Sequence, residues 1–438
     1  MCNIINRIIS NEFWGKLVKN VGVLFIGSSF ASVLNFFTTI LIIKAVSNES
    51  YGYFVVAQQY MTLIDAALNF QSWQGVIKYG SEALVSKNKN KLVAIIKCGY
   101  IIDVASAILG IVVAFLLIPL VAIILNWSNT IILLAYLFSI EIIFHLEGTS
   151  TGVLRLYDKF KYFSICNVIT ALIQLIAVFI MYIVGCRSLI QMTIVFIVFD
   201  IVSKLSILIS AIVIIRKEGQ LRNVVHADLH QIDKTFLKYT MWGNISRIAD
   251  LPIGYFDVFI ISTLSYELVS IFKIFKQIIS MISKLTSPVS AAILPQFSMM
   301  VAKGNAKDAY HKVIRIRNSI GIVMISIIII CSFGAKPVFA IILGKEYAEQ
   351  TLLFIVLLAV YGISFSYVAI HPFFASIGMT KEAFVINLIS NAIYCVFLWT
   401  FVPIMGLYAV VIGTAVQFIG FIFVETIIIK KYLRYKCI

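Results

Sequence analysis

Lysine residues recur on one face of a hydrophobic stretch in the second half of the chain. Between Phe272 and Pro288 the polar residues follow one another at steps of three and four, which is the spacing of one face of an α-helix. These residues are Lys273, Lys276, Gln277, Ser280, Lys284 and Ser287. An ammonium group at membrane depth costs on the order of 3 kcal/mol, so three on one face are tolerable only where that face lines a water-filled or anion-filled cavity. The pattern predicts a cationic passage through a membrane.

Three other hydrophobic stretches carry polar faces with helical spacing. The first has Ser28, Ser32, Asn35 and Thr39, and the second has Gln58, Thr62, Asp65, Asn69 and Ser72. The third has Thr240, Asn244, Arg247, Asp250 and Asp257. We predict that the four faces line one central cavity. For the first face, hydrogen bonding between neighbouring helices is an equally good interpretation.

The composition is that of a polytopic membrane protein. Of the 438 residues 61% are hydrophobic and only 13% charged, outside the usual range of soluble domains. The net charge of +15 does not indicate nucleic acid, because the basic residues are scattered between apolar segments and form no basic domain. The seven cysteines show no CxxC spacing and are interpreted as packing residues. The sequence has no phosphate-binding glycine loop, nucleophile elbow or metal-ligand spacing, so we expect no catalytic residue, cofactor or metal.

Twelve segments are apolar over the roughly 20 residues needed to cross a bilayer. Their expected limits are 21–43, 53–74, 99–125, 129–147, 163–184, 189–215, 239–263, 268–297, 318–343, 350–370, 384–403 and 406–429. With the N-terminus in the cytoplasm, 26 of the 35 Lys and Arg residues fall in inside segments, 4 in outside loops or in the outer part of a span, and 5 elsewhere within spans. This bias predicts that both termini are cytoplasmic.

The chain divides into two similar halves. IIKAVSNESYGYF at 42–54 aligns without a gap with IISTLSYELVSIF at 260–272, and each copy is followed by a span and a basic segment. This parallel repeat of six spans predicts two bundles. The expected ranges are an amphipathic cytoplasmic N-terminus (1–20), a first bundle (21–215), a cytoplasmic linker (216–238), a second bundle (239–429) and a basic tail (430–438).

Other polar residues within spans are interpreted structurally. Asp200 and Lys204, four residues apart, are expected to pair with each other. Glu141, His145 and Glu147 are interpreted as an interfacial cluster, because His145 and Glu147 are only two residues apart and would not share a helical face. His371 is interpreted as a capped histidine in a loop. Asp103 is interpreted as a hydrated carboxylate near the cytoplasmic end of a span.

Four stretches resemble a known family, the O-antigen flippases (Wzx-type) of the MOP (multidrug/oligosaccharidyl-lipid/polysaccharide) exporter superfamily. They are Tyr51-Gly52, QSWQGVIKYG at 71–80, DVFIIS at 257–262 and LPQFSMMVAKGNAKDA at 294–309. The chain departs from the family pattern at Ala45-Val46-Ser47, where leucine and glycine are usual.

The resemblance implies an all-α membrane protein with two pseudo-symmetric six-helix bundles around a central cavity. It also implies alternating access and a cargo of oligosaccharide linked to polyprenyl pyrophosphate, of the undecaprenyl type, in the bacterial inner membrane. A pyrophosphate carries about two negative charges, for which Lys and Arg in a low-dielectric cavity can replace water. The expected headgroup contacts are Arg247, Lys273, Lys276 and Lys284. The expected hydrogen-bonding contacts are Asn35, Gln58, Asp65, Asn69, Asn244, Gln277 and Ser280. Asp65, Asp250 and Asp257 are candidates for binding a coupling ion.

Three other functions remain open. A MATE-type exporter of organic cations shares the architecture, but an acid characteristic of its first span is missing here. A lipid II flippase is closer in electrostatics but typically has two further C-terminal spans. A polysaccharide polymerase would need a sizeable external loop, and the expected external loops are short. The expected protein is a monomer, and a polymerase and a chain-length regulator are candidate partners.

Overall fold

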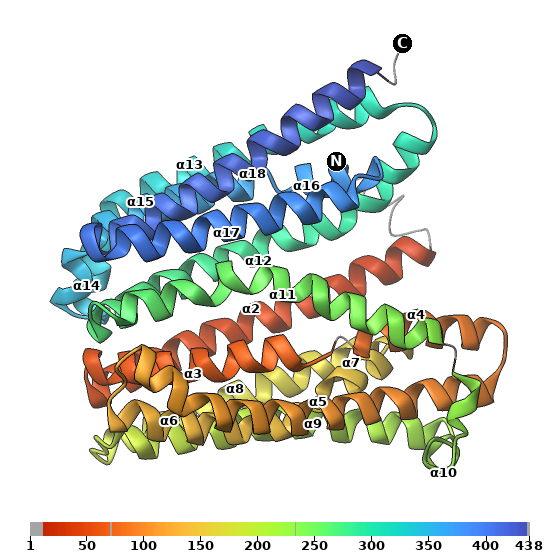
Figure 1. The fold of residues 1–438 in the computed structure, drawn as a ribbon, viewed down its shortest axis with the longest axis horizontal. Coiled ribbons are helices and arrows are strands. Elements are labelled where there is room, and N and C mark those ends of the chain that lie inside the picture. The colour runs from red at the N-terminus through yellow and green to blue at the C-terminus, as the bar shows by residue number, and fades with distance from the viewer. Residues whose placement is uncertain (1–11, 71, 233, 436–438) are drawn as a thin grey trace. The chain divides into compact units, whose positions relative to one another are not determined.

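The computed structural model describes residues 12–70, 72–232 and 234–435, and all the regular secondary structure in these ranges is helical (Figure 1). The predicted all-α class is confirmed. The chain separates into two compact units between Ile248 and Ala249, a division that falls inside a single helix, α11. The predicted bundle limits, 21–215 and 239–429, stay predictions.

The first unit contains nine α-helices, two short 3₁₀ helices and the beginning of α11 among its described residues. The α-helices are α2 (Glu12–Val46), α3 (Asn48–Leu68), α4 (Ser72–Val85), α5 (Lys89–Ile124), α6 (Asn129–Ile140), α7 (Glu147–Leu156), α8 (Phe160–Ile183), α9 (Leu189–Lys217) and α10 (Leu221–Val225). The 3₁₀ helices are η1 (Glu141–Phe144) and η2 (Leu229–Gln231).

The second unit begins within α11 and continues to α18. Its helices are α11 (Lys234–Ser262), α12 (Tyr266–Ala302), α13 (Ala306–Ile342), α14 (Lys345–Glu349), α15 (Thr351–Ser366), α16 (Ile370–Ser376), α17 (Thr380–Met405) and α18 (Leu407–Tyr435). The predicted linker, 216–238, comprises the end of α9, the short α10 and η2, and the start of α11.

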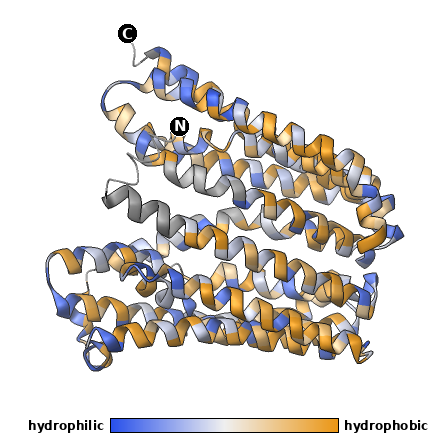
Figure 2. Ribbon diagram, turned by 180° about the vertical axis from the view of Figure 1, so that it is seen from behind, coloured by the Kyte–Doolittle hydropathy of each residue, from blue (hydrophilic) through white to orange (hydrophobic). Residues whose placement is uncertain are grey.

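Nine helical segments of the described ranges are long and apolar enough to cross a membrane. The three predicted spans outside this set correspond to α3, α11 and α12, the helices that carry most of the polar and charged residues discussed above. Large apolar side chains such as Ile123, Phe333 and Ile404 are strongly exposed, as expected for helices surrounded by lipid. Figure 2 shows hydrophobic residues along the helices and hydrophilic residues gathered at many helix ends. The chain is a multi-pass membrane protein.

Three predicted spans are interrupted rather than continuous. The predicted span 53–74 contains the end of α3, where Asn69 adopts an extended conformation. The predicted span 129–147 contains the 3₁₀ helix η1 between α6 and α7. The predicted span 350–370 ends where α15 gives way to α16, and Pro372 near the start of α16 explains this break. Proline lacks an N–H group, and its ring would clash with the carbonyl of Val368 in a continuous helix.

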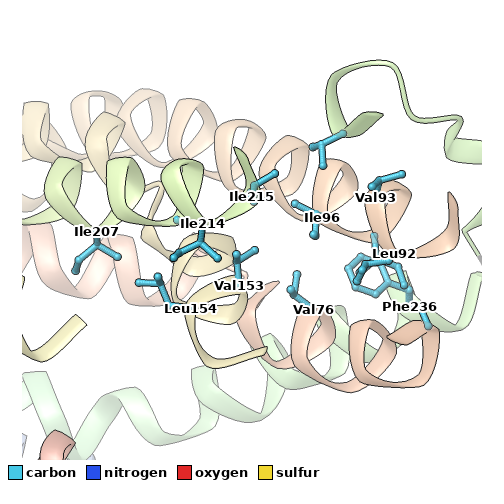
Figure 3. Packing of buried hydrophobic residues seen from close by; sticks show 14 residues of the cluster. Val76, Leu92, Val93, Ile96, Val153, Leu154, Ile207, Ile214, Ile215 and Phe236 are labelled. Atoms are coloured by element: carbon cyan, nitrogen blue, oxygen red, sulfur yellow. The ribbon is translucent and has the colours of Figure 1, made fainter. Parts of the chain in front are cut away.

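A hydrophobic cluster holds together the helix ends of the first unit (Figure 3). Val76 of α4, Ile96 of α5, Val153 of α7 and Ile214 of α9 are almost completely buried in it. Phe236 contributes from the first turn of α11, so the beginning of α11 belongs to this core. Helices α4 and α7 approach closely at Gly152, where an added Cβ atom would lie 3.1 Å from the Trp73 Cα atom.

Candidate functional site

The predicted lysine face of α12 is less buried than the opposite face of the same helix. Ile274, Phe275 and Ile279 are nearly inaccessible, and the Phe275 ring lies 5.5 Å from that of Phe339 and 5.2 Å from that of Phe354. The polar face carries the partly buried Lys273, Lys276, Gln277 and Lys284 and the exposed Ser280. The helical spacing therefore separates an apolar packing face from a cationic face.

Lys276 is paired within the second unit. Its Nζ atom lies 2.6 Å from Oδ2 of Asp257 on α11 and 3.4 Å from the Gly254 carbonyl oxygen. The Asp257 side chain is 2% exposed, whereas that of Lys276 is 20% exposed. The other carboxylate oxygen of Asp257 accepts a hydrogen bond from the Val258 backbone N–H. Asp257 therefore balances part of the positive charge of the lysine face.

The predicted polar contacts of the first unit lie on α2, α3 and α11. Asn35 is exposed on α2, while Gln58, Asp65 and Asn69 are partly buried. The Asn69 amide is 3.4 Å from Asp65 Oδ1. Asn244 is buried and donates a hydrogen bond of 3.1 Å to the Ala67 carbonyl oxygen in the last turn of α3.

The Asn244 contact satisfies one of the carbonyl groups that a helix leaves free at its C-terminal end. The partly buried Arg247 follows three residues later on α11. The side chain of Asp250, a predicted ion-coupling candidate, lies outside the described residues. The substrate-binding and ion-binding roles of all these residues stay predictions.

Five ionisable side chains converge inside the first unit, from α3, from the end of α6 and the η1 break that follows it, and from α9. We refer to them as the His145 cluster: Asp65, Glu141, His145, Asp200 and Lys204. His145 Nδ1 is 2.8 Å from Asp65 Oδ1, and His145 Nε2 is 3.2 Å from Glu141 Oε1. The Lys204 ammonium group contacts Glu141, Asp200 and His145 Nε2. The Glu141 side chain is 2% exposed and that of His145 is 9% exposed.

The sequence interpretation of this region was partly right. Asp200 and Lys204 pair as predicted. Glu141 and His145 cluster with each other, but both are buried inside the first unit and bind residues of two other helices, and the interfacial depth assigned to them stays a prediction. The informative spacing is the four residues between Glu141 and His145, not the two residues between His145 and Glu147. The sequence contains two pairs of ionisable residues with this spacing within predicted spans, at 141 and 145 and at 200 and 204. These two pairs are the sequence signal that could have indicated the cluster.

The cluster also contains donor atoms suited to a cation. One atom each of Glu141, His145 and Asp200 lie within 4.8 Å of one another, close enough to share a metal ion. However, the Lys204 ammonium contacts all three side chains and takes the place that such an ion would need. The arrangement therefore fits an internal lysine better than a bound metal.

Two other buried acids have partners that the sequence did not indicate. Asp103 of α5 is fully buried, not hydrated, and its Oδ2 accepts a 2.7 Å hydrogen bond from the Thr149 backbone N–H in the first turn of α7. A carboxylate in this place stabilises the N-terminal end of a helix. In the second unit, His371 of α16 is not a capped loop residue, because its Nδ1 lies 3.2 Å from Oε1 of the buried Glu425 on α18.

A family described as "Polysaccharide biosynthesis protein" matches residues 17–301, which is well over half of the chain. The chain belongs to this family. The matched residues of this polysaccharide biosynthesis family include the whole of the first unit from residue 17 onward, α11 and nearly all of α12. The family match therefore contains both the His145 cluster and the lysine face.

One curated relative is the inner membrane protein YghQ of Escherichia coli (strain K12). It is 28% identical over 122 residues, which are 28% of this chain and 34% of the relative. The match thus spans about a third of the length of that relative.

Two solved structures share the fold of this family member over nearly its whole length. An inward-facing multidrug resistance MATE family transporter of the MOP superfamily has a TM-score of 0.74 at 13% identity and is matched over 91% of this chain and 95% of that chain. The lipid II flippase MurJ in an inward closed conformation has a TM-score of 0.67 at 18% identity. This match covers 93% of this chain and 87% of that chain. These likenesses confirm the predicted MOP fold, and at this identity they show the fold alone.

Proposed function

We propose that this protein is a flippase that moves an oligosaccharide linked to polyprenyl pyrophosphate from the cytoplasmic to the outer leaflet of the bacterial inner membrane. The lysine face of α12 carries the proposal, together with the polysaccharide biosynthesis family. A pyrophosphate entering the membrane loses water, and ammonium groups on a polar helix face replace that hydration. Lys273, Lys276 and Lys284 are the headgroup contacts in this proposal, and Lys276 also pairs with Asp257.

The sugar portion needs hydrogen-bonding groups rather than charge. Asn35, Gln58, Asn69 and Ser280 supply such groups on α2, α3 and α12, and all four are exposed or partly exposed. Amide and hydroxyl groups can both donate and accept, which suits sugar hydroxyls. Alternating access of the two bundles, cytoplasmic termini and function as a monomer belong to the same proposal.

A deletion strain tests the transport function. Without the flippase, lipid-linked oligosaccharide should accumulate in the cytoplasmic leaflet and surface polysaccharide should disappear. Loss of a polymerase would instead leave single repeat units displayed outside. Accumulation of lipid II or of organic cations in the deletion strain would favour the two related transporter functions and overturn this one.

Variants of the lysine face test the proposed binding site. Lys273→Ala and Lys284→Ala should each reduce surface polysaccharide at least tenfold, which corresponds to about 1.4 kcal/mol of lost binding. Membrane levels should stay unchanged. Lys303→Ala, in the exposed turn after α12, is the matched control and should leave export normal. Normal export in both lysine-face variants would reject the site.

A further inference from the structure

His145 is surrounded so that its imidazole has a hydrogen-bonding partner in either protonation state. Nδ1 faces the Asp65 carboxylate at 2.8 Å, which accepts a hydrogen bond from Nδ1–H in both states. Nε2 faces two different groups. The Lys204 ammonium can donate to it when it is unprotonated, and Glu141 Oε1 at 3.2 Å can accept from it when it is protonated.

The charges around the imidazole favour uptake of a cation. The cluster has three carboxylates, Asp65, Glu141 and Asp200, against the single ammonium of Lys204. Two further acids lie on other elements packed around the cluster. Glu147 of α7 interacts electrostatically with His145 and Lys204. Asp103 of α5 interacts electrostatically with Glu147. With these acids ionised, negative charge exceeds positive charge, and a buried excess of charge is costly.

A proton fits this site better than a metal ion. The Lys204 ammonium lies among the three donor atoms that a metal would use, whereas a proton needs only the Nε2 lone pair. In addition, Glu141 Oε2 is buried and has no hydrogen-bond partner, so Glu141 has spare accepting capacity. A new N–H group on His145 therefore meets a carboxylate that can bind it.

We propose that His145 is a proton-binding site of this transporter and that its proton is the coupling ion. The coupling part rests on the proposed flippase function. One proton, delivered from the aqueous phase by a hydronium ion that becomes water, forms an N–H bond at Nε2, and the hydrogen bond from Lys204 to Nε2 breaks. The new N–H donates to Glu141 Oε1, and Lys204 keeps its three protons and its contact with Asp200. No other bond changes.

The position of the site explains how one proton affects helix geometry. His145 lies between η1 and α7, where the helix is interrupted, while Asp65 belongs to α3 and Lys204 to α9. Breaking the contact between Lys204 and His145 removes one of the links from α9 to the interrupted segment. The protonation state of His145 thereby changes how tightly three elements of the first bundle are held together.

Proton binding can be measured without any transport assay. The chain has five histidines, so replacing His226, His230, His311 and His371 by Asn leaves His145 alone. In this variant, labelled with ¹⁵N-histidine and reconstituted in lipid, NMR should show Nδ1 protonated throughout and Nε2 changing state between about pH 5 and about pH 9. If the fourfold variant is unstable, the difference between wild-type and His145→Asn spectra gives the same signal. An Nε2 atom that keeps one state across this range overturns the proposal.

Coupling is tested in proteoliposomes that contain lipid-linked oligosaccharide. With one proton exchanged per substrate, each unit of pH difference should change the leaflet ratio of substrate up to about tenfold in the wild type. The His145→Gln variant should still move substrate between the leaflets, but its leaflet ratio should not change with the pH gradient. His371→Gln, at the helix break of the second unit, is the matched control and should respond like the wild type.

The outcomes separate the two proposals. If the wild type moves no lipid-linked oligosaccharide, the proposed function fails, and the NMR titration alone decides whether His145 binds a proton. If the wild type moves substrate but His145→Gln responds equally to the gradient, the coupling proposal fails alone. A response to a sodium gradient, and not to pH, would likewise overturn it.

Discussion

Asp257 and Lys276 form a pair in which one partner is far more buried than the other. Asp257 is nearly inaccessible beside the ammonium group at 2.6 Å, while Lys276 retains some exposure. Removing one member of a buried pair leaves the other charge uncompensated, and this costs more than removing both. Lys276 therefore has a structural role in addition to its place on the lysine face.

This asymmetry predicts the result of a double-mutant cycle. Asp257→Asn should lower the free energy of unfolding by about 3 to 5 kcal/mol, and Lys276→Gln should also destabilise the protein. The double variant should be less destabilised than the sum of the two changes. Thermal unfolding of the purified protein in detergent measures all three.

The exposed pair Lys345 and Glu349, 3.7 Å apart on α14, is the matched control. Its double variant should change stability by less than about 1 kcal/mol. Strictly additive effects of the Asp257 and Lys276 substitutions would mean that the two side chains do not interact.

Residue types and spacing predicted the polar face of α12 but not the partners of its members. Helical periodicity places Lys273, Lys276 and Lys284 on one face from sequence alone. The pairing of Lys276 with Asp257 joins two helices, and no local pattern specifies which residues of α11 face α12. The same reason explains why the His145 cluster was missed, since Asp65 and Lys204 are far from His145 in the sequence.

At the scale of elements, interrupted helices distinguish the structure from the predicted continuous spans. Hydropathy measures how apolar a segment is and does not report a change of axis within it. The break before α16 could have been expected from Pro372, whereas the η1 segment contains no proline or glycine. Its polar residues, Glu141 and His145, bind other helices instead of following one continuous face.

Close packing of α4 and α7 gives an element-scale prediction. Gly152→Ala places a methyl group 3.0 Å from Val76 Cβ and 3.1 Å from the backbone at Trp73, so these neighbouring atoms must move by a few tenths of an ångström. We expect a loss of about 1 to 3 kcal/mol. Gly334→Ala, in the middle of α13 with nothing within 4 Å, should instead stabilise by about 0.5 to 1 kcal/mol. Thermal unfolding compares the two, and equal effects would contradict the close approach.

Solvent access along α12 gives a second element-scale prediction. In a background without native cysteines, Ser280→Cys should react with a membrane-impermeant thiol reagent added to inside-out vesicles or to cells. Asn35→Cys, on α2, should behave similarly. Ile279→Cys, on the buried face next to Ser280, is the control and should react at least tenfold more slowly. Protection of Ser280→Cys in both preparations would show that its face does not contact water.

At the scale of the whole chain, composition and periodicity were enough to predict an all-helical membrane protein with two repeats. The number of spans is not settled in the same way, because the nine helices of the described residues that are long and apolar enough to cross a membrane do not include α3, α11 and α12. Most of the residues that we propose as substrate contacts lie on these three helices.

The predicted orientation can be tested at two exposed lysines. Lys345→Cys, at the start of α14, should be labelled from outside intact cells, and Lys303→Cys, in the turn before α13, only after permeabilisation. The reverse pattern would invert the topology, and labelling of both sites from outside would contradict the path of α13 across the membrane.

The turn between α12 and α13 joins two helices of 37 residues each. A helix of this length measures about 55 Å, against a hydrocarbon core of about 30 Å, so each must project well beyond the bilayer. When a rigid helix tilts, its end moves further than the parts near the pivot. If the end lies about 25 Å from the pivot, a tilt of about 10° displaces it by about 4 Å. Small rearrangements at membrane depth would thus become large displacements at the turn between α12 and α13.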